Sequence, residues 1–313
     1  MLWEILRMKN SEYHIPVLLH AATDALVLNP NGVYVDVTFG GGGHSRAILD
    51  KLDKGRLIAF DQDIDAAPNG LTDSRFLLVQ QNFRHLQNVL NFHGIDQVDG
   101  VLADLGVSSH QFNEGERGFS FRNDGKLDMR MNQNSELSAF HVVNNYDELD
   151  LNNLFIQFGE FTKGQASGIT KKILSLREEG ELESTQKLAY SVGGLSPFKA
   201  RNKFLARVFQ AIRIEVNQEM QALLEMLEQI PTCLKPDGRL VVITYHSLED
   251  RMAKNFIRSG NFNGELDKDF FGNVNRPLEE VVRKPIVPSE SEVRENSRAR
   301  SAKLRIASKK SKK

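Results

Sequence analysis

Residues 33–45 read Val33-Tyr-Val-Asp-Val-Thr-Phe-Gly-Gly-Gly-Gly-His-Ser45, and this stretch decides the fold. Its β-branched and aromatic beginning is typical of a buried strand, which runs directly into four glycines and then a helix-like segment to about Leu52. Glycines at such a junction let the backbone approach a ligand closely, and a helix start offers free N–H groups to an anion. A dinucleotide phosphate or the carboxylate of S-adenosylmethionine would suit this turn. Because Ser45 departs from the G-x-G-x-x-G pattern, a plain tight turn fits as well.

Three more strand-like segments follow, with helix-like sequence among them. The strands are expected at residues 56–60, 76–79 and 98–103, with a helical stretch at 84–92. The first and last of these strands end at Asp61 and Asp104. Alternation of short apolar strands with helices predicts an α/β domain with a parallel sheet and helices on both faces.

This alternation breaks at about Phe112, and helical patterns dominate from there to about Arg213. Residues 203–215 place their apolar side chains on one helical face. Pro236-Asp-Gly238 predicts a turn, after which residues 239–244 form a fifth strand. The period of two in residues 302–306 predicts a last strand with one buried and one basic face. We therefore expect an α/β domain of residues 1–112 and 214–313, interrupted by an all-helical domain of residues 113–213.

Acidic residues end two of the predicted strands, where an open α/β sheet binds its ligands. Asp61 follows the glycine run at the distance where such sheets bind ribose hydroxyls. Asp63 and Asp65 complete a D-x-D-x-D spacing, but Ala66 stands where a calcium loop needs its sharp-turning glycine, so the ribose interpretation is the stronger. Asp104 is placed to accept a hydrogen bond from a reacting amine, and the alternative for it is a helix cap.

His246, at the tip of the fifth strand, is a candidate base or RNA contact, although a lone histidine is more often structural. Arginines interleaved with aromatic residues in the insert suit stacking and phosphate contacts to a splayed base, although the aromatic residues could equally be core. From Arg298 to Lys313 there are eight basic residues and no acidic one, which suits contact with RNA or else a solvated tail. The candidate RNA contacts are Arg117, Phe121, Arg130, Arg251, Arg300, Lys303 and Arg305.

The composition is that of an ordinary globular protein, with 40% hydrophobic and 26% charged residues and a net charge of −1. The single cysteine, Cys233, allows neither an internal disulfide nor a cysteine-based zinc site, and we expect no metal and a cytoplasmic location. No apolar run is long enough to suggest a membrane partner. Met8 is a second candidate start after Met1.

Taken together, the segments resemble the bacterial 16S ribosomal RNA (cytosine-N4)-methyltransferases from His14 to about Ile306. The resemblance is carried by Asp36-Val-Thr-Phe-Gly-Gly-Gly-Gly-His-Ser45, Asp104-Leu-Gly-Val-Ser-Ser-His-Gln111, Arg117-Gly-Phe-Ser-Phe121, Leu127-Asp-Met-Arg-Met131, Phe209-Gln-Ala-Ile-Arg-Ile214, His246-Ser-Leu-Glu-Asp-Arg251 and Arg298-Ala-Arg-Ser-Ala-Lys-Leu-Arg305. Their order and spacing are more specific than any one of them. Small departures include Tyr245, which replaces a frequent phenylalanine.

The resemblance implies a class I methyltransferase (Rossmann-like) sheet with an inserted helical substrate-recognition domain. It implies S-adenosylmethionine as cofactor, with contacts at Gly42, Gly43, His44, Asp61, Phe83, Asp104 and Gln111. The implied activity is N4-methylation of a cytidine in the decoding region of 16S rRNA in the small ribosomal subunit. The oligomeric state is open, a homodimer included.

We expect Asp104 to position the cytosine amino group, with a stacking aromatic supplied by Phe121 or Tyr245. Three alternatives stay open at this point. A nicotinamide dehydrogenase would share the sheet, a DNA amino-methyltransferase would share the chemistry, and a non-catalytic ribosome assembly factor could share the basic end.

Overall fold

The computed structural model describes residues 16–311, and the chain divides into two compact units. Of the described residues, the first unit comprises 16–106 and 222–311, and the second comprises 107–221. The second unit begins before and ends after the predicted insert of residues 113–213. It does so because Val107 packs on the core of this unit and because a helix runs on to Asn217. The choice between Met1 and Met8 lies outside the described residues.

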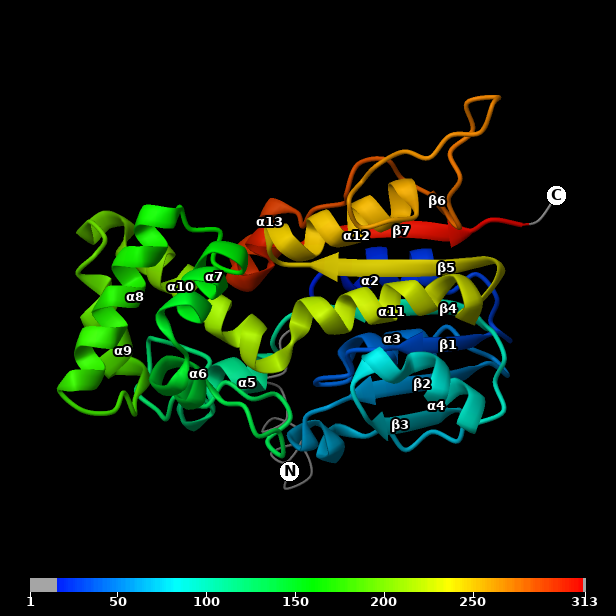
Figure 1. Cartoon of the computed structure of the whole chain (residues 1–313). Helices are drawn as coiled ribbons and strands as arrows, with labels where there is room; N and C mark the ends of the chain where they lie inside the picture. Colours follow the sequence, from blue (N-terminus) through cyan, green and yellow to red (C-terminus); the bar gives the residue numbers. More distant parts are fainter. Residues whose placement is uncertain (1–15, 312–313) are drawn as a thin grey trace, which may run out of the picture. The chain divides into compact units, whose positions relative to one another are not determined.

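The first unit is a seven-stranded sheet with helices on both faces (Figure 1). Its strands are β1 (Val33–Asp36), β2 (Arg56–Asp61), β3 (Phe76–Gln80), β4 (Val98–Asp104), β5 (Leu234–Thr244), β6 (Leu278–Glu280) and β7 (Lys303–Lys309). Its helices are α2 (Leu19–Leu26), α3 (Gly43–Leu49), α4 (Leu86–Phe92), α11 (Glu219–Cys233, from Ala222 onward), α12 (Ser247–Ser259) and α13 (Glu290–Glu295). In Figure 1, α4, α11 and α12 lie on one face, and α2 and α3 lie on the other.

The strand order is β3-β2-β1-β4-β5-β7-β6. The first five strands are parallel, β7 is antiparallel to β5, and β6 is antiparallel to β7. The strand order reverses between β1 and β4, where Asp36 is level with Leu102. Ligands of open α/β sheets bind outside the carboxyl ends of the strands at such a reversal. The fold therefore directs attention to the residues that follow β1 and β4.

These elements confirm the predicted α/β class, including the fifth strand and the last strand, and they show that the last strand is antiparallel to the fifth. The turn expected at residues 236–238 lies inside β5 instead, as an irregularity in its pairing with β4, and Asp237 there has a φ of 62°. Strand β6 was not predicted, because its three residues, Leu-Glu-Glu, are too few to show a period.

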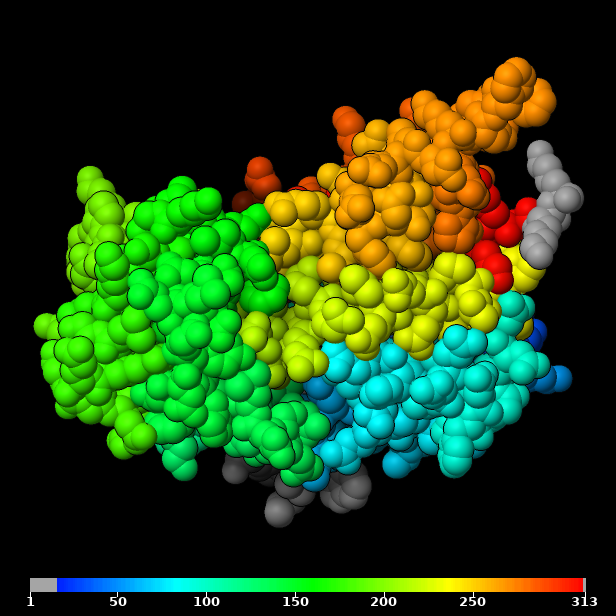
Figure 2. All heavy atoms as spheres, in the orientation of Figure 1, coloured from blue at the N-terminus to red at the C-terminus, as the bar shows by residue number. Residues whose placement is uncertain are grey.

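The segment between α12 and β6 projects from the first unit as a loop, drawn in orange in Figures 1 and 2. A bridge between Lys268 and Val274 closes this loop, and the Asp269 carboxylate accepts the backbone N–H groups of Phe271 and Asn273. Phe270 is 98% exposed at its tip. The loop is thus ordered by its own hydrogen bonds.

The second unit is helical (Figure 1). Its elements are α5 (Ser109–Asn113), α6 (Ala139–Asn145), α7 (Glu148–Gln157), α8 (Lys163–Glu178), α9 (Thr185–Gly193) and α10 (Arg201–Asn217), with short 3-10 turns η3 (Gly115–Arg117) and η4 (Phe198–Ala200). Ser138, Thr162 and Ser184 cap α6, α8 and α9 through their side-chain oxygens. The unit has its own core, in which Val208, Phe209 and Ile212 supply the apolar face expected for residues 203–215.

Across residues 16–311 there is no helix with both the length and the apolar character needed to cross a membrane.

Candidate active site

The glycine run forms a close turn between β1 and α3. Gly42 has a φ of 74°, which lies in the left-handed region that favours glycine. A Cβ on Gly43 would lie 2.2 Å from Cγ of Pro16, so a larger residue must displace that proline. Because Gly41 and Gly43 are partly exposed, the turn presents its backbone to a ligand at this edge of the sheet.

The turn is supported from below by Asp36, the last residue of β1. Its side chain is fully buried, and its Oδ2 accepts a hydrogen bond from Ser45 Oγ at 2.7 Å. Its Oδ1 accepts the backbone N–H of Thr38 at 3.1 Å. Burial raises the pKa of Asp36, because these partners and His44 offset the loss of solvation only in part. Asp36 thereby joins the start of the turn to α3.

Asp61 ends β2 and faces the same turn. Its Oδ2 accepts the N–H of Gly40 at 2.8 Å, and its Oδ1 accepts the N–H of Asp63 at 2.8 Å. Burial raises the pKa of Asp61 to about 6, so the carboxylate is ionised at neutral pH. Each carboxylate oxygen has a second lone pair, which suits acceptance of ribose hydroxyls. Phe83 follows the neighbouring strand β3, and Asn82 before it donates to Oε1 of Gln62, the residue directly after β2.

Asp104 ends β4, on the other side of the strand reversal. Its backbone N–H donates to Thr38 Oγ1 at 2.7 Å, which ties the end of β4 to the residue after β1. The hydroxyl of Tyr245, just beyond β5, donates to Asp104 Oδ1 at 2.8 Å. Burial raises the pKa of Asp104 to about 7, although the Tyr245 hydrogen bond lowers it. One carboxylate oxygen is therefore held in place, and the side chain keeps 22% of its surface exposed.

His44, on the first turn of α3, lies against the second oxygen of Asp104. Its Nδ1 is 3.5 Å from Asp104 Oδ2, and its Nε2 is 3.2 Å from the carbonyl oxygen of Val17. Because a carbonyl only accepts, Nε2 carries the proton of the neutral ring. Burial lowers the pKa of His44, which keeps the ring neutral at physiological pH. Asp104 Oδ2 and His44 Nδ1 are thus two neighbouring acceptors for an N–H donor.

Comparison with known proteins identifies the family of the chain. The model of the MraW methylase family matches residues 11–310. The chain belongs to this family.

Two relatives named ribosomal RNA small subunit methyltransferase H are each 53% identical to the chain. The protein of Flavobacterium johnsoniae aligns over 95% of this chain and 98% of its own length, and that of Bacteroides fragilis over 97% and 100%. A solved rRNA methylase of Streptococcus thermophilus is 12% identical, with a TM-score of 0.42 over 95% of this chain and 99% of its own.

As a family member, the chain is a methyltransferase whose cofactor is S-adenosylmethionine. The residues at the strand ends fit this cofactor. Gly42 and Gly43 leave no room for a Cβ, and Asp61 offers lone pairs to ribose hydroxyls. The alternative that the chain is a nicotinamide dehydrogenase is wrong, because the chain belongs to a methylase family.

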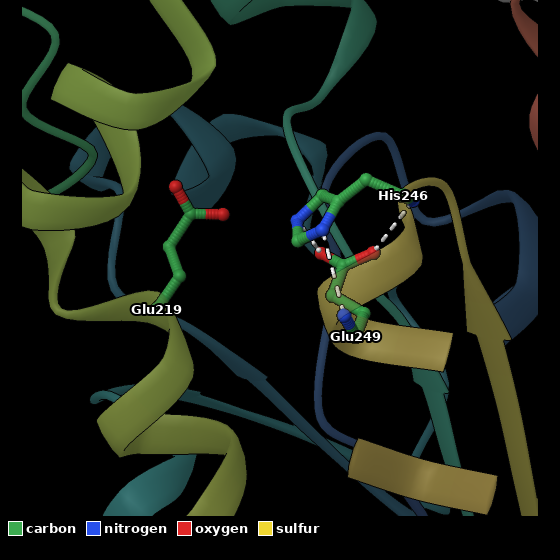
Figure 3. Close-up of side chains that lie close together, drawn as sticks. All are labelled: Glu219, His246 and Glu249. Atoms are coloured by element: carbon green, nitrogen blue, oxygen red, sulfur yellow. Dashed lines mark hydrogen bonds and ion pairs between the residues drawn. The ribbon is translucent and has the colours of Figure 1, made fainter. Parts of the chain in front are cut away.

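The side chain of His246 is bound to Glu249 and is not free to act as a base (Figure 3). It is the N-cap of α12, where its Nδ1 accepts the N–H of Glu249 and its Nε2 is 3.0 Å from Glu249 Oε1. Glu249 in turn accepts the backbone N–H groups of Tyr245 and His246. The His246 side chain is only 8% exposed. We therefore assign His246 to the capping of α12 and to the shape of the turn after β5.

The predicted basic face of β7 is largely neutralised. Arg305 is buried, and its Nε donates to Asp250 Oδ1 at 2.7 Å, while Lys303 Nζ is 2.9 Å from Asp250 Oδ2. Burial alone would raise the pKa of Asp250, but the two cations lower it by more than burial raises it. The pKa is therefore below its usual value, and the carboxylate stays ionised. The prediction that Arg305 contacts RNA is corrected accordingly. Arg251 and Arg300 are exposed.

The insert residues have mixed positions within the second unit. Arg117 is 8% exposed, and its guanidinium donates to the carbonyls of Arg130 and Met131, so the prediction that it contacts RNA is also corrected. Arg130 is paired with Asp128 at 2.7 Å. Phe121 packs edge-on against the core, and Gln111 is buried in the capping box of α5, where its side chain accepts the Ser108 N–H.

Sequence reasoning missed two supports of the site. Asp36 lies inside the quoted motif, but the sequence does not indicate its role. The side chain is buried and supports the turn through Ser45 and a backbone N–H. Tyr245 was expected as a stacking aromatic, whereas its hydroxyl is bound to Asp104. The departure from the family's frequent phenylalanine was the signal that could have revealed this hydrogen bond.

Proposed function

We propose that the chain methylates N4 of a cytidine in the RNA of the small ribosomal subunit. The names of its relatives support the RNA substrate, because curated proteins aligned over nearly their full length are small-subunit rRNA methyltransferases. The observation that carries the amino-group target is the arrangement at the end of β4. Asp104 there is an acceptor held on one oxygen by Tyr245 and available on the other.

The chemistry of the target explains why an acceptor is needed. The lone pair of a cytosine amino group is delocalised into the ring, so the nitrogen is a weak nucleophile. S-adenosylmethionine, when bound, supplies a methyl group on a positively charged sulfur. A side chain that accepts the amino hydrogens turns the nitrogen lone pair out of conjugation and holds it in line for attack.

In this proposal, Asp104 Oδ2 accepts one amino N–H. As the N–C bond forms and the bond between the methyl carbon and sulfur breaks, the sulfur leaves as a neutral thioether, and the nitrogen becomes acidic and releases a proton. A carboxylate whose pKa is about 7 can take this proton at neutral pH without having to be a strong base. The neutral His44 beside it leaves Nδ1 free of a proton, so it does not compete as a donor for Asp104. The target base has to leave its stack to reach these groups.

The proposal is tested with labelled S-adenosylmethionine and small ribosomal subunits from a strain that lacks the gene. We expect label in the subunits that ribonuclease releases and deoxyribonuclease does not. Label in DNA instead would support a DNA amino-methyltransferase, and tight subunit binding without label would support an assembly factor.

Asp104→Asn is the matched variant for the role of the carboxylate. It keeps the size of the side chain but replaces one acceptor oxygen by a donor NH₂ group. We expect kcat to fall about 100-fold, with the Kd for S-adenosylmethionine changed far less. Near-normal turnover of Asp104→Asn would remove Asp104 from the mechanism.

A further inference from the structure

The helical unit contains an open groove of about 400 Å³ that the active-site residues do not explain. Ala189 of α9 and Leu205 of α10 form its apolar floor, and both are buried. Phe121, Arg122, Tyr190 and Arg201 form its walls. A floor of this kind, bordered by aromatic rings and guanidinium groups, is suited to a planar ligand that carries negative charge.

Two aromatic side chains in or beside this groove are presented to solvent. Tyr190 is 90% exposed, and Phe198 in the neighbouring turn η4 is 84% exposed. The guanidinium carbon of Arg201 lies 5.7 Å from the centre of the Phe198 ring, and Phe121 is anchored edge-on to Phe209 at 5.5 Å. The rings of Tyr190 and Phe198 contribute little to the core of the unit. They are, however, ready platforms on which bases can stack.

The charge around the groove is positive. Between Ser184 and Ile214 the chain has six lysines and arginines and no acidic residue. Some of them serve the unit itself, since Arg207 donates to backbone carbonyls and Arg213 pairs with Glu219. Arg201 donates through Nε to the Gly193 carbonyl at 3.2 Å, and among residues 16–311 its two Nη groups have no hydrogen-bond partner. Arg122 is exposed, and its guanidinium has no hydrogen-bond or ion-pair partner among residues 16–311. A cation of this kind is available for a phosphate group.

We propose that this groove binds a single-stranded segment of the RNA substrate, with a base stacked on Tyr190 and neighbouring phosphates bound by Arg122 and Arg201. The proposal rests on the proposed function, because it assumes that RNA is the substrate. It places RNA contacts on residues other than Arg117 and Arg130, whose guanidinium groups are used inside the unit.

The composition of the groove favours a single strand over other anionic ligands. Duplex RNA offers phosphates but keeps its bases stacked, so it could not use Tyr190 or Phe198. An acidic peptide could bind the arginines but would gain little from the exposed rings. Gln186 and Asn202, which also line the groove, are exposed amides that can both donate to and accept from base edges.

The test measures binding of a fluorescein-labelled single-stranded RNA of about 12 nucleotides to the full-length chain. We expect Tyr190→Ala to weaken binding about 10-fold, within the range for loss of one stacked base. Arg122→Gln is expected to reduce the slope of log K against log salt by about 0.7, the value for one lost contact to a single strand. Lys171→Gln on α8 and Leu149→Ala on α7 are matched controls, because both residues are exposed on the same unit and lie outside the groove.

Two further measurements separate this proposal from the proposed function. For small subunits, Tyr190→Ala should raise KM while the Kd for S-adenosylmethionine stays unchanged, and this KM effect requires an active wild-type enzyme. The 12-nucleotide RNA is measured without any methyl transfer, so the groove can be tested even if subunits accept no label. Wild-type affinity in both Tyr190→Ala and Arg122→Gln would overturn the proposal. Equal competition by a 12-base-pair duplex or by polyglutamate would overturn it as well, whereas competition by the single strand alone would support it.

Discussion

Removal of the Tyr245 hydroxyl should move the pH dependence of methylation. In the structure this hydroxyl donates to Asp104 Oδ1 at 2.8 Å and lowers a pKa that burial has raised to about 7. Other groups that influence the Asp104 carboxylate are His44 on α3, Glu249 on α12 and Asp36 on β1. All of these groups remain in Tyr245→Phe, so the variant changes one hydrogen bond.

The magnitude follows from the strength of that bond. A hydrogen bond to a charged group contributes about 1.5–3 kcal/mol, and a change of one in pKa corresponds to 1.36 kcal/mol, so we expect the pKa of Asp104 to rise by at least about 1. In the proposed mechanism the ionised carboxylate is the active form, so we expect activity to fall as the pH drops through this pKa. With a pKa near 8 instead of 7, the ionised fraction at pH 7 drops about fivefold, whereas at pH 9 the two proteins differ by about 10%.

The assay is kcat/KM for small subunits between pH 6 and pH 9, since this ratio reports the ionisation of the free enzyme. We expect the acidic limb of Tyr245→Phe to move to higher pH, with recovery of activity at pH 9. Tyr146→Phe is the matched control, because Tyr146 makes an equivalent hydrogen bond to Glu215 at 2.7 Å within the helical unit. An unchanged midpoint in Tyr245→Phe, or a loss of activity that is equal at every pH, would refute the reasoning.

Three further predictions follow from other contacts. Gly43→Ala should raise the Kd for S-adenosylmethionine, measured by calorimetry, at least about 10-fold, because the new Cβ would lie 2.2 Å from Pro16. An unchanged Kd would show that the turn accommodates a Cβ and would contradict this prediction. Asp250→Ala should lower the free energy of unfolding by about 2–3 kcal/mol in urea denaturation, since it leaves Lys303 and Arg305 without their partner. As a control, Arg300→Ala at an exposed position should change this free energy by less than about 0.5 kcal/mol. His246→Ala should lower it by about 1 kcal/mol through loss of the α12 cap, with kcat close to wild type; a large fall in kcat at retained stability would restore His246 as a catalytic base.

The fold was largely predictable because its signals are local. Strands β1, β2 and β4 are short apolar runs that end in Asp36, Asp61 and Asp104. The glycine turn determines where α3 starts. The irregularity in β5 was not predictable from the turn residues 236–238, because pairing with β4 on one side and β7 on the other extends the strand across them. Long-range pairing of this kind leaves no period in the sequence.

The sequence predicted where the site residues lie along the strands but not which side chains they hydrogen-bond. Placement of Asp104 at a strand end required only the alternation of strands and helices. Its hydrogen bond to Tyr245 joins residues 141 positions apart, which no local pattern reveals. The same limit explains the corrected arginines. Arg117 and Arg305 have the composition of RNA contacts, yet their guanidinium groups are used by backbone carbonyls and by Asp250 in the folded chain.

The identity of the methylated nucleoside tests the central claim most directly. Small subunits from a strain that lacks the gene are incubated with the protein and labelled S-adenosylmethionine, digested to nucleosides, and separated by chromatography before mass analysis. We expect the label in N4-methylcytidine, and we expect it to disappear with Asp104→Asn. Label in 5-methylcytidine or in a 2′-O-methylated nucleoside would contradict the account, because neither reaction needs an acceptor for amino hydrogens at the end of β4.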